Sequence, residues 1–291
     1  MNDTEFDNYK EAGRIAHDVL HVCAAEIKVG VLHSDIFDMV LDKIASAGAA
    51  PSFPPNISIN ECAAHDTPSP IDERVFCEGD LVKLDIGTHI DGYIADTAVT
   101  VDLGDHKTLC EASEKALEAA IALVKPDLVV SEIGKAVEET ITSYGYRPIM
   151  NLTGHGLARY DLHHGISIPN TGQFGNAVLR ADNAIAIEPF ATTGSGMVHE
   201  GTRAEIYQVT GDAPVRAPTA RKILKKADEM KGLPFSRRWL GIPKAELAIP
   251  QLIRQGNLYD YHILSDIPGS FVAQFEHTVI VTEDGPFVTT R

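Results

Sequence analysis

Residues 81–101 read LVKLDIGTHIDGYIADTAVTV, which is two mainly apolar runs on either side of Asp91-Gly92. An Asp-Gly pair between two such runs is a strong local signal for a β-hairpin with a two-residue turn. In that hairpin Ile90 pairs with Tyr93, and the pairing of every other residue follows from this register. The stretch therefore predicts two long antiparallel strands.

This register places two carboxylates on one face of the hairpin. Gly87 lies opposite Asp96, and Asp85 shares the face of Gly87 because it lies two residues away. The aspartates are then diagonal neighbours, roughly 7–8 Å apart at the backbone, so both side chains can reach one cation. Their apolar surroundings favour a bound metal, since two buried carboxylates without a counter-charge are costly. Two solvent-facing aspartates on an ordinary strand are the alternative.

Three further candidate ligands stand far along the chain. His155 lies in a glycine-flanked turn, Glu188 ends the apolar run Ala184–Ile187, and Glu276 begins another apolar run. Each is a weak signal alone. Together with the two aspartates they make an oxygen-rich set of four carboxylates and one imidazole, which suits divalent ions such as Mn, Fe, Co or Zn. Four carboxylates would neutralise two divalent cations, which favours a two-metal centre.

Hydrophobic spacing outlines the remaining elements. Apolar residues at three- and four-residue steps predict helices, and short apolar runs predict buried strands. Ser34 and Ser131 are the expected N-caps of the second and fourth helices. The expected helices cover residues 6–22, 34–48, 107–124 and 131–144, and the expected strands include 57–59, 184–187 and 279–281.

Residues 216–256 differ in charge from the rest of the chain. They contain ten Lys and Arg but three Asp and Glu, with helical spacing, inside a region that is otherwise β-rich. We interpret them as a helical insertion whose basic side chains either form a solvated helix face or dock on RNA or the ribosome.

Composition excludes several classes of protein. The chain has 291 residues, 25 Lys and Arg against 41 Asp and Glu, and a net charge of −16, which disfavours general binding to nucleic acid. No apolar run is long enough for a membrane span, and the acidic start lacks the pattern of a signal peptide. The four scattered cysteines fit reduced thiols. We therefore expect a cytoplasmic globular protein.

Five motifs follow one another along most of the chain: SINECAAHDTP at 58–68, the Asp85/Asp96 hairpin, NLTGH at 151–155, IEPF at 187–190 and AQFEHT at 273–278. Taken in this order, they resemble the methionine aminopeptidases. The helical insertion is similar to that of the type 2 enzymes, and the lack of a long N-terminal extension is similar to the archaeal form.

The resemblance implies an α+β pita-bread fold, in which a curved antiparallel sheet holds the metals and helices flank it. Residues 1–291 would form a single catalytic domain, with 216–256 as a helical insertion subdomain within it.

The resemblance also implies a ligand set of Asp85, Asp96, His155, Glu188 and Glu276 for two divalent ions. Asp96 and Glu276 would bridge the ions, Asp85 would chelate one, and His155 with Glu188 would bind the other. Glu188 would also carry the proton from the attacking water to the leaving amine.

Four more residues would contact the substrate. His65 would lie at the scissile amide, and His163 would donate a hydrogen bond to its carbonyl oxygen. Phe53 matches an aromatic wall of the methionine pocket, and Tyr261 is a second candidate for that wall.

Two residues depart from the family pattern. His164 stands where a small residue is frequent, so either His163 or His164 could face the substrate. Asp66 follows His65 where an aromatic residue is frequent, which affects the edge of the pocket.

The implied activity is removal of the N-terminal methionine from nascent proteins and peptides with a small second residue, by a water that two metals activate. The expected enzyme is a monomer that makes at most a transient contact with the ribosome. An X-Pro dipeptidase or aminopeptidase of the same fold is one alternative. A non-catalytic, ribosome-associated pita-bread protein is another.

Overall fold

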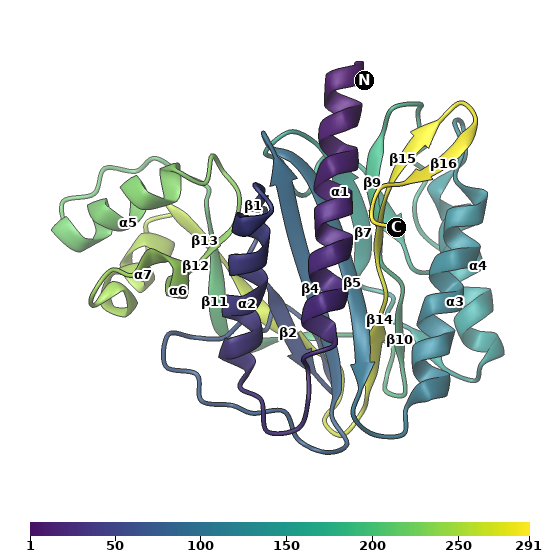
Figure 1. Ribbon diagram of the computed structural model, residues 1–291, viewed down its shortest axis with the longest axis horizontal. Helices are drawn as coiled ribbons and strands as arrows, with labels where there is room; N and C mark the ends of the chain where they lie inside the picture. The colour runs from purple at the N-terminus through teal and green to yellow at the C-terminus, as the bar shows by residue number, and fades with distance from the viewer.

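A computed structural model describes residues 1–291 (Figure 1). The helices are α1 Asp3–Ala24, α2 His33–Ser46, α3 Lys107–Leu123, α4 Val130–Ser143, α5 Pro218–Asp228, α6 Arg237–Leu240 and α7 Ala245–Arg254. The strands are β1 Ala50–Pro51, β2 Asn56–Ile59, β3 Cys62–Ala64, β4 Leu81–Ile90, β5 Tyr93–Asp102, β6 Arg147–Pro148, β7 Thr153–Leu157, β8 Ser167–Pro169, β9 Ala184–Ile187, β10 Phe190–Thr192, β11 His199–Val209, β12 Phe235–Ser236, β13 Leu258–Ser265, β14 Val272–Gln274, β15 His277–Thr282 and β16 Gly285–Val288.

The predicted hairpin is confirmed as β4 and β5. Ile90 pairs with Tyr93 and Gly87 pairs with Asp96, so the register is the one that the Asp91-Gly92 turn predicts. Both turn residues have positive φ, 48° for Asp91 and 88° for Gly92, as this class of tight turn requires.

The strands pair antiparallel throughout. Strand β4 pairs with β1, β2 and β5 in one sheet, and a second sheet has the strand order β16-β15-β9-β7-β8. Two further sheets have the orders β14-β10-β6 and β12-β11-β13-β3. A bridge between Ala98 in β5 and Glu276 joins the hairpin to the strands that lead into β15. The sheets thereby form a curved surface that carries residues from both halves of the chain.

Helices cover the outer face of this surface in two pairs (Figure 1). Helices α1 and α2 pack on β4 through a core that includes Ile15, Phe37 and Leu84. Helices α3 and α4 pack on β9 through a core that includes Leu117 and Ile185. Because side chains alternate along a strand, Asp85 points away from the face that carries Leu84.

Gly87 shapes the inner face. A Cβ at this position would lie 2.2 Å from Phe53 Cε1, so only glycine lets the aromatic ring lie against β4. The candidate pocket wall therefore depends on a glycine in the hairpin.

The expected N-caps are wrong for two helices. Helix α2 begins at His33 after Leu32, and α4 begins at Val130 after Val129, so Ser34 and Ser131 lie inside the first turns. Neither helix has a side-chain cap. Distant backbone carbonyls instead accept from the first residues: Arg74 O from His33 N, and Ala177 O from Val130 N. A tertiary contact thus satisfies the first N–H group of each helix, which has no partner within the helix itself.

Residues 216–256 contain α5, β12, α6 and α7, as the helical spacing predicts. These elements share a core of their own, which includes Ile223, Phe235 and Leu252. The segment connects β11 to β13, which are neighbours in one sheet. It is the left-hand lobe in Figure 1. Arg237 pairs with Glu205 of β11 at 2.7 Å, which ties the lobe to the sheet.

None of the helices combines the length and the apolar character that crossing a membrane would require.

Candidate active site

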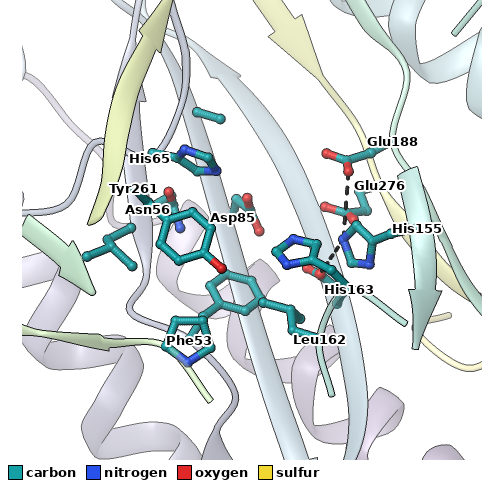
Figure 2. Close-up of a pocket in the computed structure, with 14 residues that line it drawn as sticks. Phe53, Asn56, His65, Asp85, His155, Leu162, His163, Glu188, Tyr261 and Glu276 are labelled. Atoms are coloured by element: carbon teal, nitrogen blue, oxygen red, sulfur yellow. Dashed lines mark ion pairs between the residues drawn. The ribbon is translucent and has the colours of Figure 1, made fainter. Parts of the chain in front are cut away.

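The five predicted metal ligands converge on one pocket (Figure 2). They come from five places along the chain. Asp85 lies in β4, Asp96 in β5, His155 in β7, Glu188 directly after β9, and Glu276 between β14 and β15. Residues that are separated by up to 191 positions in sequence therefore face each other across the curved sheet.

Distances identify the centre of this group. One ligand atom each from Asp96, His155 and Glu276 lie within 4.8 Å of one another. His155 Nε2 lies 3.6 Å from Asp96 Oδ2 and 3.8 Å from Glu188 Oε1. This spacing leaves room for a cation between the side chains, with carboxylate oxygens and one imidazole nitrogen around it.

Without a bound cation, the negative charges of these buried carboxylates are strongly unfavourable. Burial raises the pKa of Asp96, Glu188 and Glu276 well above their usual values, and the neighbouring carboxylates raise each of them further. Burial also raises the pKa of Asp85. The pKa of His155 falls to about 3, first because of burial and then because of His163 nearby, so its imidazole is neutral and able to bind a metal.

The donor set fits divalent ions. Oδ1 of Asp85 and Oδ1 of Asp96 are both buried and have no hydrogen-bond partner in the chain. Four carboxylates and a neutral imidazole suit Mn, Fe, Co or Zn, and the cations would remove the mutual repulsion of the carboxylates.

Sequence reasoning missed Gln274. Its Nε2 lies 3.3 Å from Glu188 Oε2 and 3.3 Å from Glu276 Oε2, so one amide orients two candidate ligands. The only signal in the sequence is its position two residues before Glu276, which places both side chains on the same face of an extended strand. Partners of this kind orient metal ligands and tune their basicity.

Hydrogen bonds between strands fix the positions of Asp96 and Glu276. Thr97 Oγ1 donates to Glu276 O at 2.8 Å, and Asp96 N donates to Thr278 Oγ1 at 2.7 Å. The hydroxyl of Thr278 donates in turn to Asp96 O at 2.8 Å. Two threonines thus lock the backbone of β5 to the chain at the start of β15, beside the candidate ligands Asp96 and Glu276.

The predicted substrate residues line the same pocket. The rings of His155 and His163 are 4.5 Å apart, and those of His65 and Tyr261 are 5.3 Å apart. Phe53 closes the pocket on the side away from the carboxylates (Figure 2). The structure therefore brings all nine sequence-predicted site residues together.

His163, not His164, lies in the pocket. The imidazole of His164 is on the surface, where its Nδ1 is 2.8 Å from Asp161 Oδ2. The side chain of His164 is 59% exposed. Of the two adjacent histidines, His163 alone lines the pocket of the predicted ligands.

His65 has an unusual backbone conformation, with φ of 66°. Its Nδ1 is 3.1 Å from His262 O, and because a carbonyl only accepts, Nδ1 carries the proton and Nε2 is a free acceptor. The next residue, Asp66, is buried and receives two hydrogen bonds from Arg74, at 2.6 and 2.9 Å. The unusual acidic residue thus anchors the loop after His65 through an ion pair rather than through an aromatic contact.

A model of metallopeptidase family M24 matches residues 7–283. The chain belongs to this family. Within the M24 family it groups with the methionine aminopeptidases. It is 48% identical to the methionine aminopeptidase of Archaeoglobus fulgidus over 293 residues, which cover 100% of both chains.

Two solved structures extend the comparison. The methionine aminopeptidase of Thermotoga maritima is 25% identical and has a TM-score of 0.74, over 100% of this chain and 98% of that one. The structure of a thermophilic Arx1 has a TM-score of 0.90 at 19% identity, over 99% of this chain and 91% of that one, which shows the fold alone. The predicted pita-bread fold of the M24 family is therefore confirmed.

Proposed function

We propose that the protein is a metal-dependent aminopeptidase that removes methionine from the N-terminus of nascent proteins and peptides, with a preference for a small second residue. The observation that carries the proposal is the buried pocket in which four carboxylates and one neutral imidazole face an apolar wall. Such a site combines charge for metal-assisted hydrolysis with a surface for an unbranched apolar side chain. An enzyme that acts on nascent chains would work in the cytoplasm.

The proposed cofactors are two divalent ions, of Co, Mn, Fe or Zn. Asp96 and Glu276 would contact both ions, Asp85 would hold one, and His155 with Glu188 would hold the other. When bound, such ions lower the pKa of water and polarise a carbonyl group. The buried oxygens of Asp85 and Asp96 that lack partners support this assignment.

The chain's own residues would bind the peptide and move its proton. Glu188, held by Gln274 at 3.3 Å, would receive a proton from the attacking water and deliver it to the leaving amine. His65 Nε2, as a free acceptor, would receive the N–H of the scissile amide. His163 would donate a hydrogen bond to the substrate carbonyl oxygen, where negative charge develops.

We expect His163→Ala to lower kcat by roughly 10²–10³-fold, because loss of one donor to a developing oxyanion has that effect in other hydrolases. His164→Ala is the matched control, since His164 lies on the surface beside Asp161. Steady-state kinetics with Met-Ala-Ser measure both variants. Equal losses in the two variants would show that the pocket histidine has no special role.

The substrate preference gives a direct test of the proposed activity. We expect methionine release from Met-Ala-Ser, at least about tenfold slower release from Met-Leu-Ser, and no cleavage of an X-Pro dipeptide. Cleavage of the X-Pro substrate alone would assign the chain to the prolidase branch. No cleavage of any peptide by the metal-loaded protein would favour the non-catalytic alternative.

We also propose that the chain acts as a monomeric single domain whose insertion, 216–256, contacts the ribosome transiently. Arg221, Lys222 and Lys225 support this, since they are exposed along α5 and form no ion pair. Co-sedimentation with ribosomes at low salt should disappear when all three are replaced by Glu. Unchanged co-sedimentation would refute the contact.

A further inference from the structure

Asn56 places a buried side-chain oxygen without a partner in the active-site pocket. Asn56 lies in β2 directly opposite Asp85 in β4, so their side chains are cross-strand neighbours on the inner face (Figure 2). The residue is 4% exposed and lines the same pocket as the carboxylates.

The orientation of the amide follows from its one hydrogen bond. Asn56 Nδ2 donates to Pro54 O at 3.0 Å. Turning the amide over would set its oxygen against that carbonyl, so Oδ1 is the atom that stays free. A buried acceptor without a partner has lost its hydrogen bonds to water, so a donor on a molecule bound in the same pocket would stabilise it.

No group of the chain donates a hydrogen bond to this oxygen. Phe53 and Ile206 are apolar, and the hydroxyl of Tyr261 already donates to Gln208 Oε1 at 2.6 Å. The nearest polar neighbour across the strands is the carboxylate of Asp85, which accepts as well. Two adjacent acceptors favour a ligand group that has more than one hydrogen-bond donor hydrogen, or one that carries a positive charge.

We infer that the side-chain oxygen of Asn56 accepts a hydrogen bond from the free α-amine of the substrate's first residue. The inference rests on the proposed function, because an aminopeptidase substrate carries this amine next to the scissile bond. The methionine side chain has no donor of its own. Asn56 is then a specificity residue that favours a free N-terminus over a blocked one.

Calorimetry of the metal-loaded protein tests this contact with two ligands, L-methioninamide and 4-(methylthio)butanamide, which lacks only the amine. Asn56→Leu keeps the size of the side chain but removes the acceptor. We expect the preference for the amine, measured as the ratio of the two Kd values, to fall roughly tenfold relative to wild type.

Phe53→Leu is the matched control, because Phe53 lines the same pocket but accepts no hydrogen bond. It should weaken both ligands together and leave the ratio within about twofold of wild type. Metal content and Tm, measured for each variant, separate a lost contact from a lost ion or a damaged fold.

The inference is wrong if Asn56→Leu keeps the wild-type ratio of the two Kd values, as it would by weakening both ligands equally. It is also wrong if the variant binds both ligands more tightly, since the oxygen would then hold a water that the ligand displaces. These results do not depend on turnover. Failure of the proposed function would show separately, as absence of methionine release from Met-Ala-Ser by the wild type.

Discussion

Replacing Asp96 with Asn is expected to lower kcat/KM for Met-Ala-Ser by at least about 10³-fold, because the metals supply several kcal/mol of transition-state stabilisation. Asn keeps the size of the side chain but removes one of the four buried charges. The lost oxygen belongs to the tight group that Asp96 forms with His155 and Glu276. Glu276→Gln should have a similar effect, since Glu276 lies in the same group.

Kinetics and metal analysis, carried out on the same samples, measure this effect. Glu118→Gln is a suitable control because Glu118 pairs with Lys115 on the surface at 2.8 Å, and its activity should match wild type. An Asp96→Asn or Glu276→Gln protein with wild-type rates and intact metal content would refute the ligand assignment.

The hairpin shows what a sequence can predict well. A two-residue turn at Asp91-Gly92 leaves a single register, and the alternation of strands then fixes the face of every side chain. The placement of Asp85 and Asp96 on one face therefore follows from local rules. These rules say nothing about which strand will face the hairpin.

The wider site depended on the resemblance, because its residues meet only through tertiary structure. His155, Glu188 and Glu276 come from separate strands, and no periodicity links them to the hairpin. Ordered motifs supplied that link. The resemblance to methionine aminopeptidases and the pita-bread fold were therefore predicted correctly, but through several motifs taken together.

Other features were wrong or missed for physical reasons. Ser34 and Ser131 look like caps in the sequence. Both helices instead begin one residue before the serine, where a distant backbone carbonyl accepts from the first N–H group. Gln274 and Asn56 are ordinary polar residues in sequence. Their importance comes from where the fold places them. Gln274 lies beside two carboxylates, and the side-chain oxygen of Asn56 is buried without a hydrogen-bond partner.

The choice between His163 and His164 shows the same limit. The two residues are identical and adjacent, so composition cannot separate them. The fold does so through Asp161, which holds His164 at the surface while His163 turns inward against His155. A single substitution at each position can therefore separate the two side chains in an assay.

Removal of the metal is expected to have the second large effect. A chelator should abolish methionine release, because the carboxylates and imidazoles that remain in the pocket do not lower the pKa of a bound water or polarise the substrate carbonyl group as a divalent ion does. The fold should persist, since the packed cores under α1 to α4 do not include the ligands. Circular dichroism before and after chelation checks this.

The most direct measurement is to strip the protein with chelator, restore Co(II), Mn(II) or Fe(II) separately, and follow methionine release from Met-Ala-Ser beside an X-Pro dipeptide. We predict that at least one ion restores methionine release, that activity reaches its plateau near two ions per chain, and that the X-Pro dipeptide stays intact. Undiminished methionine release from the stripped protein would contradict the account, as would no release from protein that has bound its metal in full.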